Sequence, residues 1–165
     1  MRVLLFLVFL SIGCTKVSAQ NYQLHSVYIY SFIKYVEWPA TSQGDFIVGV
    51  YGDSPVYDHL LKMAAVKKAG DRNIKIQKIS AMESIADLEM LFVSNKQSDE
   101  FDTIKEQLAG SSTLIITESN GLGEEGSNIN FVEMSGKLKF ELNRAAMERQ
   151  NLKVSSELTA LAIVI

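Results

Sequence analysis

Apolar and aromatic side chains recur every three or four residues between Tyr22 and Pro39, which predicts an amphipathic helix. Pro39 should end it, because the residue before a proline disfavours the helical conformation. A helix this aromatic needs a large apolar surface to cover it, so we expect it to pack on a sheet. The positions that define its predicted apolar face are Leu24, Val27, Tyr28, Phe32, Tyr35 and Val36.

Three short apolar runs, at residues 45–51, 90–94 and 113–117, are typical of strands covered on both faces, as in a parallel sheet. Residues 73–79 largely alternate between apolar and polar, which predicts a strand with one exposed face near a sheet edge. Helices are predicted between these strands, beginning near Pro55 and from about Ser98. Strands that alternate with helices indicate an α/β sheet.

Two alternating runs, 128–134 and 137–142, flank Ser135-Gly136 and predict a β-hairpin. The predicted fold is therefore α/β, with a mixed, mostly parallel sheet flanked by helices and a C-terminal β-hairpin. A short helix from Asn143 and a final apolar segment from Ser155 should follow. Because no linker or repeat interrupts the pattern, we expect residues 20–165 to form a single domain.

The first 19 residues have the pattern of a secretory signal peptide, with Arg2, an apolar run and then Val17-Ser18-Ala19. We expect cleavage after Ala19; a retained anchor is an alternative, although the apolar run is too short to span a bilayer. Residues 11–14 partly resemble a bacterial lipobox, so acylation of Cys14 is another alternative. Cys14 is the only cysteine, so cleavage after Ala19 would exclude disulfides and thiolate metal sites.

The net charge of −3 argues against nucleic-acid binding, which needs a basic face. The two histidines lack the spacing of a zinc site, and no nucleophile stands in an elbow-like turn. Residues 121–126 match G-x-G-x-x-G, but a strand pattern follows them and Glu124 and Glu125 would repel a phosphate, so a turn is favoured. We therefore expect a non-catalytic protein without metal or cofactor.

Small-molecule binding is an alternative function, because open α/β sheets bind ligands beyond the carboxyl ends of their strands. The alternative role for Asp53 is to cap the helix that follows. The predicted ligand-binding residues are Gly52, Asp53, Ser54, Ser94, Asn95 and Thr117.

Several motifs stand in a fixed order along the chain. They are residues 32–39 (Phe-Ile-Lys-Tyr-Val-Glu-Trp-Pro), 47–54 (Ile-Val-Gly-Val-Tyr-Gly-Asp-Ser), 129–131 (Ile-Asn-Phe), 137–143 (Lys-Leu-Lys-Phe-Glu-Leu-Asn), Ala145-Ala146 and 152–158 (Leu-Lys-Val-Ser-Ser-Glu-Leu). Together they resemble the YfiR-like periplasmic proteins, whose best-known members repress a membrane diguanylate cyclase. The resemblance spans roughly residues 22–162.

The resemblance implies a periplasmic α/β domain, often dimeric, that acts by binding another protein. The implied partner is the periplasmic part of a membrane diguanylate cyclase or sensor kinase, and a homodimer is a further possibility. Membrane contact is expected only through that partner or a lipid on Cys14. Some family members carry cysteine pairs that make them redox-responsive; the mature chain lacks them, so redox control is not implied.

Two surfaces are predicted to contact the partner. The first is the end of the opening helix, although Trp38 in it has core packing as an alternative role. The second combines the turn after the hairpin with the start of the last segment. The residues are Glu37, Trp38, Pro39, Glu141, Asn143, Ser155 and Ser156.

Overall fold

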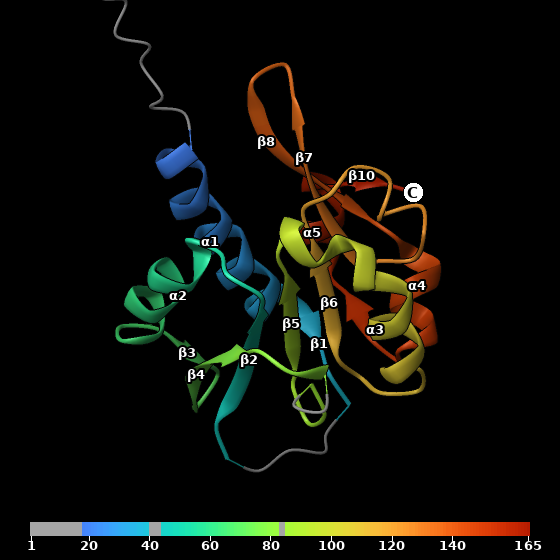
Figure 1. Cartoon of the computed structure of the whole chain (residues 1–165). Coiled ribbons are helices and arrows are strands. Elements are labelled where there is room, and N and C mark those ends of the chain that lie inside the picture. Colours follow the sequence, from blue (N-terminus) through green and yellow to red (C-terminus); the bar gives the residue numbers. More distant parts are fainter. Residues whose placement is uncertain (1–17, 40–43, 83–84) are drawn as a thin grey trace, which may run out of the picture.

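The computed structural model describes residues 18–39, 44–82 and 85–165 (Figure 1). The α-helices are α1 (Ser18–Tyr35), α2 (Val56–Ala64), α3 (Phe101–Gln107), α4 (Arg144–Arg149) and α5 (Ser156–Leu161), and a 3-10 helix, η2 (Asn95–Glu100), precedes α3. The strands are β1 (Val36–Glu37), β2 (Phe46–Tyr51), β3 (Lys68–Ala69), β4 (Arg72–Ile79), β5 (Met90–Val93), β6 (Leu114–Thr117), β7 (Ile129–Met134), β8 (Lys137–Leu142), β9 (Lys153–Val154) and β10 (Ile163–Val164). The predicted leader and Cys14 lie outside the described residues, except that α1 already includes Ser18 and Ala19.

Eight of the described strands form one sheet in the order β10-β8-β7-β6-β5-β2-β4-β3. Neighbouring strands from β4 to β7 run parallel, whereas β7 and β8 are antiparallel. Ser135 and Gly136 join these two strands with φ angles of 52° and 71°, the left-handed pair that a tight hairpin turn requires. The predicted mixed, mostly parallel sheet with its hairpin is confirmed.

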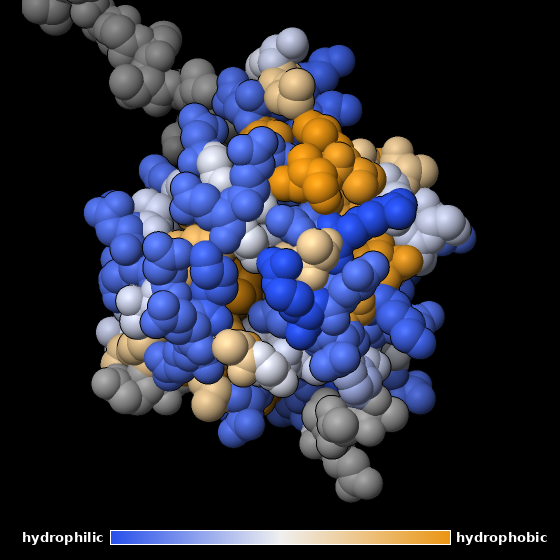
Figure 2. Space-filling view, turned by 90° about the vertical axis from the view of Figure 1, so that its right-hand side faces the viewer, coloured by the Kyte–Doolittle hydropathy of each residue, from blue (hydrophilic) through white to orange (hydrophobic). Residues whose placement is uncertain are grey.

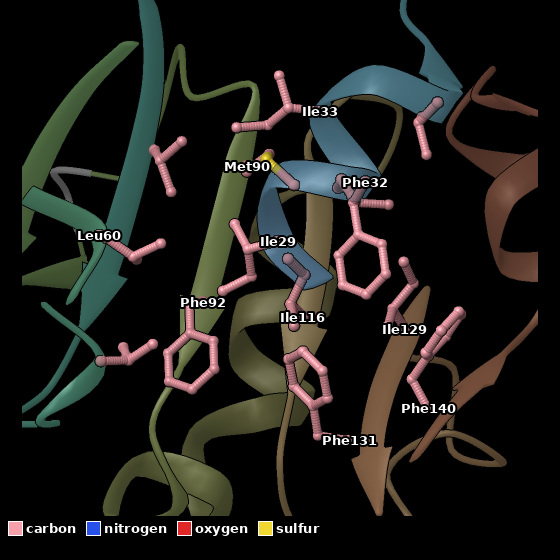
Figure 3. Packing of buried hydrophobic residues seen from close by; sticks show 14 of the residues in the cluster. Ile29, Phe32, Ile33, Leu60, Met90, Phe92, Ile116, Ile129, Phe131 and Phe140 are labelled. Carbon is pink, nitrogen blue, oxygen red and sulfur yellow. The ribbon is translucent and has the colours of Figure 1, made fainter. Parts of the chain in front are cut away.

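One face of the sheet is covered by α1, α2, α4 and α5. Figure 3 shows Ile29, Phe32 and Ile33 of α1 directed at the side chains of the central strands. Phe32 contacts Phe131 and Phe140, with ring centroids 5.8 and 5.1 Å apart. This aromatic packing anchors α1 on the sheet, as its composition predicts.

The buried stripe of α1 is displaced from the predicted one. His25, Ile29, Phe32 and Ile33 are buried, whereas Leu24 and Val27 are 40% and 56% exposed. The helix also contacts α2, so its buried stripe is rotated toward that neighbour. The helix ends at Tyr35, earlier than Pro39 requires, because the next two residues pair as β1.

The opposite face of the sheet is covered by α3 and the loops beside it. Phe101, Ile104 and Leu108 pack there on Leu91 and Ile115. The predicted helix from about Ser98 begins instead at Phe101, and residues 95–100 form the 3-10 turn. β4 lies one place from the edge, covered only by the two residues of β3, which agrees with its alternating pattern.

Candidate partner-binding groove

A two-stranded joint connects the ends of the two predicted partner surfaces. β1 pairs antiparallel with β9, which places Glu37 opposite Lys153 and Val36 opposite Val154. The Ser155 N–H then donates to the Tyr35 carbonyl at 2.9 Å. This pairing satisfies backbone groups where α1 ends, and it brings Lys153 beside Glu37 and Ser155 beside Tyr35.

Two capping side chains set the helices that follow. The Asn143 Oδ1 accepts from the Ala146 N–H at 2.9 Å and starts α4. The Ser155 Oγ accepts from the Leu158 N–H at 3.2 Å and starts α5. Asn151, with a φ of 55°, turns the chain between α4 and β9. Asn143 and Ser155 therefore have structural roles, whatever they contribute to binding.

A groove of about 620 Å³ opens between α4, β9 and α5. Its floor is apolar and its rim carries charges of both signs, an arrangement suited to an amphipathic segment. The apolar lining residues are Leu142, Met147, Leu152, Val154 and Ala160, and the polar ones are Arg144, Glu148, Lys153, Ser156 and Thr159.

An exposed apolar patch lies at the C-terminal end of the chain, just after the groove-lining part of α5. Leu161, Val164 and Ile165 are 60%, 43% and 39% exposed. Figure 2 views the side of the molecule that carries α4 and the C-terminal end, and hydrophobic atoms gather there above a strongly hydrophilic band. Contiguous exposed apolar surface of this kind is typical of protein interaction sites.

Glu157, which follows the groove-lining Ser156, lies in the first turn of α5. Its own backbone N–H and the Ser155 hydroxyl lower the pKa of its carboxyl group below the usual value. A carboxylate at a helix N-terminus is also favoured by the helix dipole. Glu157 is therefore negatively charged at neutral pH beside Ser156.

The Trp38 side chain is half-buried at the amino end of the sheet. Its Nε1–H donates to the Glu89 carbonyl at 3.0 Å, and its ring packs edge-to-face on Phe46 with centroids 5.0 Å apart. These contacts give Trp38 a packing role. Of its neighbours, Glu37 is exposed and Pro39 is half-buried.

Glu141 and Asn143 hold the glycine-rich turn against the hairpin. The Asn143 Nδ2 donates to the Gly123 carbonyl at 2.9 Å. Asn130 joins Glu141 to Thr117, donating to the Glu141 carboxylate at 2.9 Å and accepting from the Thr117 hydroxyl at 2.8 Å. A Cβ on Gly123 would lie 2.3 Å from the Glu141 carboxylate, so this glycine permits the close approach. The 121–126 run is a turn, as predicted.

The predicted ligand-binding residues do gather at the carboxyl ends of β2, β5 and β6. Gly52 has a φ of 85° and lies against Ser94 and Gln97, where no side chain would fit. Asp53 is exposed and pairs with Lys78, while the Ser54 Oγ accepts from the Val56 N–H at 3.3 Å. Of the other two predicted ligand-binding residues, Thr117 is buried and Asn95 donates its N–H to Glu118.

Side chains of α1 lie over these strand ends. The His25 Nε2 lies 3.6 Å from a Glu118 carboxylate oxygen, and Tyr22 hydrogen-bonds to Glu118 and Ser54. The Glu118 carboxylate also accepts from the Asn95 N–H at 3.0 Å. Burial raises the pKa of the Glu118 carboxyl group above its ordinary value of 4.5. Burial and the negative charge of Glu118 raise the pKa of the Tyr22 hydroxyl group. The crevice predicted for a ligand is therefore lined by the protein's own polar network.

Sequence reasoning missed the groove and the network. Arg144 and Met147 lie in no motif, and they meet Lys153 only because α4, β9 and α5 fold around one another. His25 and Glu118 are 93 positions apart, so no local pattern could have paired them.

Within the described residues, no group of three or more His, Cys, Asp or Glu side chains is arranged to hold a metal ion. None of the helices described is long and apolar enough to span a membrane.

The comparison with curated proteins gave no match. A family model described as YfiR/HmsC-like matches residues 22–163, nearly the whole described chain, and the protein therefore belongs to the YfiR/HmsC-like family of periplasmic, non-catalytic regulatory proteins.

Proposed function

We propose that this protein is exported by a signal peptide at residues 1–19 and tunes a membrane signalling protein from the periplasm. The partner is the periplasmic part of a diguanylate cyclase or sensor kinase. Residues 20–165 act as one domain, without catalysis, by contact alone. Family membership supports the regulatory role, and the groove between α4, β9 and α5 supplies a surface for it.

The groove is the observation that carries this proposal. It combines an apolar floor with Arg144, Glu148 and Lys153 on its rim, so it can bury apolar side chains and fix the orientation of a partner by charge. Glu37 and Ser156 extend the same rim through the β1–β9 joint. We assign Glu37, Ser156 and the exposed C-terminal patch to the partner contact, and the caps Asn143 and Ser155 to its support.

Affinity capture from mildly solubilised membranes of the native host tests this function. The tag belongs in the Ser135-Gly136 turn, which is exposed and is not among the groove-lining residues, because a C-terminal tag would adjoin the apolar patch. Mass spectrometry should identify one cyclase or histidine kinase. Recovery of the bait alone, from membranes that contain such enzymes, would contradict the proposal.

A groove variant then locates the contact. Ala160 lines the groove and is exposed, so Ala160→Arg fills the groove without disturbing the core. Ala145→Arg is the matched control, because Ala145 is exposed on α4 and is not among the lining residues. We expect Ala160→Arg to weaken partner binding at least about tenfold, the equivalent of losing one interface hot spot. Equal binding by the two variants would place the contact elsewhere.

The alternative function, a small-molecule receptor, has less support. A ligand that reaches the strand ends has to displace Tyr22 and His25 from Glu118. Receptor function predicts a ligand-dependent rise in melting temperature, since binding to the folded state alone stabilises it. A shift with a metabolite or nucleotide, abolished by Ser54→Ala, would favour the receptor.

A further inference from the structure

Charge is distributed unevenly between the β4–β3 end of the sheet and the segment that follows it in the sequence. Residues 56–79, which form α2, β3 and β4, contain six Lys or Arg and two Asp. Residues 83–125 contain ten Asp or Glu and only two Lys. A chain with a net charge of −3 therefore has one basic end, with a net charge of +4 in 24 residues. Such an end attracts anionic surfaces despite the overall negative charge.

A second groove lies at this basic end, between α1 and α2, which stand side by side in Figure 1. It has a volume of about 560 Å³, and none of its lining residues is acidic. Tyr30 and Met63 are among its apolar residues, and Lys62 and Lys67 border it. The Lys67 Nζ lies 5.4 Å from the centroid of the Tyr30 ring, so cation and apolar surface meet directly.

Exposed apolar side chains also concentrate here. Leu24 and Val27 are three residues apart on one face of α1, and Leu61 on α2 is 42% exposed. Val66, in the turn after α2, is 78% exposed, the highest value among the large apolar residues described. Lys67 and Lys68 follow it directly. A single exposed valine is ordinary, but four apolar side chains among lysines are a surface with a consistent chemistry.

We propose that the α1–α2 face docks on an anionic lipid bilayer, with Val27 and Val66 entering the headgroup region and Lys62, Lys67 and Lys68 attracting the lipid phosphates. The charge complementarity selects an anionic surface. The exposure selects a bilayer over a peptide, because Val27 and Val66 line the groove and are nonetheless 56% and 78% exposed, so their side chains stand at its outer rim. Projecting apolar side chains flanked by lysines are the pattern of proteins that lie at the membrane interface.

This contact is separate from the partner groove and does not depend on it. The groove at α4 and α5 has different lining residues, so both surfaces can be occupied together. Docking would confine the protein to two dimensions, next to membrane-embedded partners. It adds a direct route to the membrane beside the two routes expected from the sequence, through a partner or a lipid on Cys14.

Vesicle co-sedimentation tests the proposal. The exported protein is used in a Cys14→Ser background, which removes any acyl chain, with its N-terminus determined by mass spectrometry. We expect sedimentation with vesicles that contain phosphatidylglycerol and not with pure phosphatidylcholine, and weaker binding at high salt. Lys67→Glu should reduce binding about tenfold, because it weakens the electrostatic attraction to the lipid phosphates. Val66→Ser should reduce it about threefold, because it removes an apolar side chain from the headgroup region.

Matched controls come from the hairpin. Lys137→Glu and Met134→Ser make the same kinds of change at exposed hairpin positions that do not line the α1–α2 groove, and they should bind like the parent. All four substituted side chains are exposed, so melting temperatures should remain unchanged and a loss of binding is not a loss of fold. Equal loss in the control and test variants, or equal binding to both vesicle types, would overturn the proposal.

A fluorescence measurement gives an independent readout. Cys14 is the only cysteine, so Val66→Cys or Met134→Cys in the Cys14→Ser background offers one labelling site for a polarity-sensitive dye. The dye at position 66 should shift to the blue on phosphatidylglycerol vesicles, and the dye at position 134 should not. A shift at 134 alone, or at neither position, would show that this face does not enter the bilayer.

Discussion

The environment of Glu118 differs from that of an ordinary surface carboxylate. It lies under α1, in contact with Tyr22 and His25, and accepts the Asn95 N–H. Because burial raises its pKa in the folded state, the folded protein binds a proton more readily than the unfolded chain. The stabilisation that the protonated Glu118 carboxyl group contributes is fully present below the ordinary pKa of 4.5. It is lost as the pH rises through the higher pKa of the folded state.

Glu118→Gln should therefore change the pH dependence of stability. Glutamine keeps an oxygen that can accept the Asn95 N–H but cannot ionise. The melting temperature of the variant minus that of the parent should become more positive as the pH rises from acid to neutral. His25→Gln, measured in parallel, separates any effect of histidine ionisation from that of Glu118. Parallel melting curves for parent and Glu118→Gln over this range would mean that the carboxyl group titrates normally.

Trp38 has a packing role in the fold, and the sequence also predicts it as a partner contact. Trp38→Phe keeps the aromatic contact with Phe46 and loses the bond to the Glu89 carbonyl, which also accepts from the Leu114 N–H. We expect it to lower the free energy of unfolding by about 1 kcal/mol, and Trp38→Ala by about 3 kcal/mol. Chemical denaturation measures both. A Trp38→Ala protein as stable as the parent would leave only the binding role.

At the scale of elements, the short helix α5 depends on its cap. A helix of six residues has little intrinsic stability, so its first turn needs the acceptor that Ser155 supplies. The neighbouring Ser156 is exposed, and its hydroxyl contacts only the adjacent Glu157 among the hydrogen bonds described. Two adjacent serines, both predicted as partner contacts, thus have different structural roles.

Ser155→Ala and Ser156→Ala should separate these roles. We expect Ser155→Ala to lower the free energy of unfolding by about 1 kcal/mol and Ser156→Ala to change it by less than about 0.5 kcal/mol. Only Ser156→Ala should weaken partner binding without affecting stability. Denaturation curves combined with a binding assay give both quantities, and equal stabilities of the two variants would rule out the cap as a significant contribution.

For the whole molecule, the last residues close one edge of the sheet. β10 pairs parallel with β8, the Ile165 N–H donates to the Leu142 carbonyl, and the Arg144 N–H donates to the Ile165 carbonyl. Without β10, the edge of β8 would present unpaired backbone groups, a template for association with other chains. The C-terminal residues thus protect the sheet and also supply the exposed apolar patch.

Deletion of residues 163–165 should reveal this dual role. We expect the free energy of unfolding to fall by about 1–3 kcal/mol, from lost hydrogen bonds and apolar burial, and self-association to increase. Val164→Thr is the control, because it keeps the strand and alters one exposed side chain. Calorimetry and sedimentation velocity measure the two effects. A truncated protein that remains monomeric and fully stable would show that the β8 edge needs no cover.

Local patterns in the sequence determined the elements that have a clear period or a marked turn. The apolar run of β2, the alternation in β4 and the Ser135-Gly136 turn each reflect short-range rules of side-chain direction and backbone angle, and so does the Asn143 cap. The ordered motifs also indicated the family that the comparison confirmed. These features depend on residues close together in the chain.

Tertiary structure alone decided the rest. Two-residue strands such as β1, β9 and β10 are too short to carry a period, and they form because their neighbours present unpaired backbone groups. The buried stripe of α1 depends on where α2 lies, and the His25–Glu118 contact and the α4–α5 groove join residues brought together by the fold. Periodicity specifies which side chains share a face, whereas the packing of other elements specifies which face is buried and which surface remains to bind.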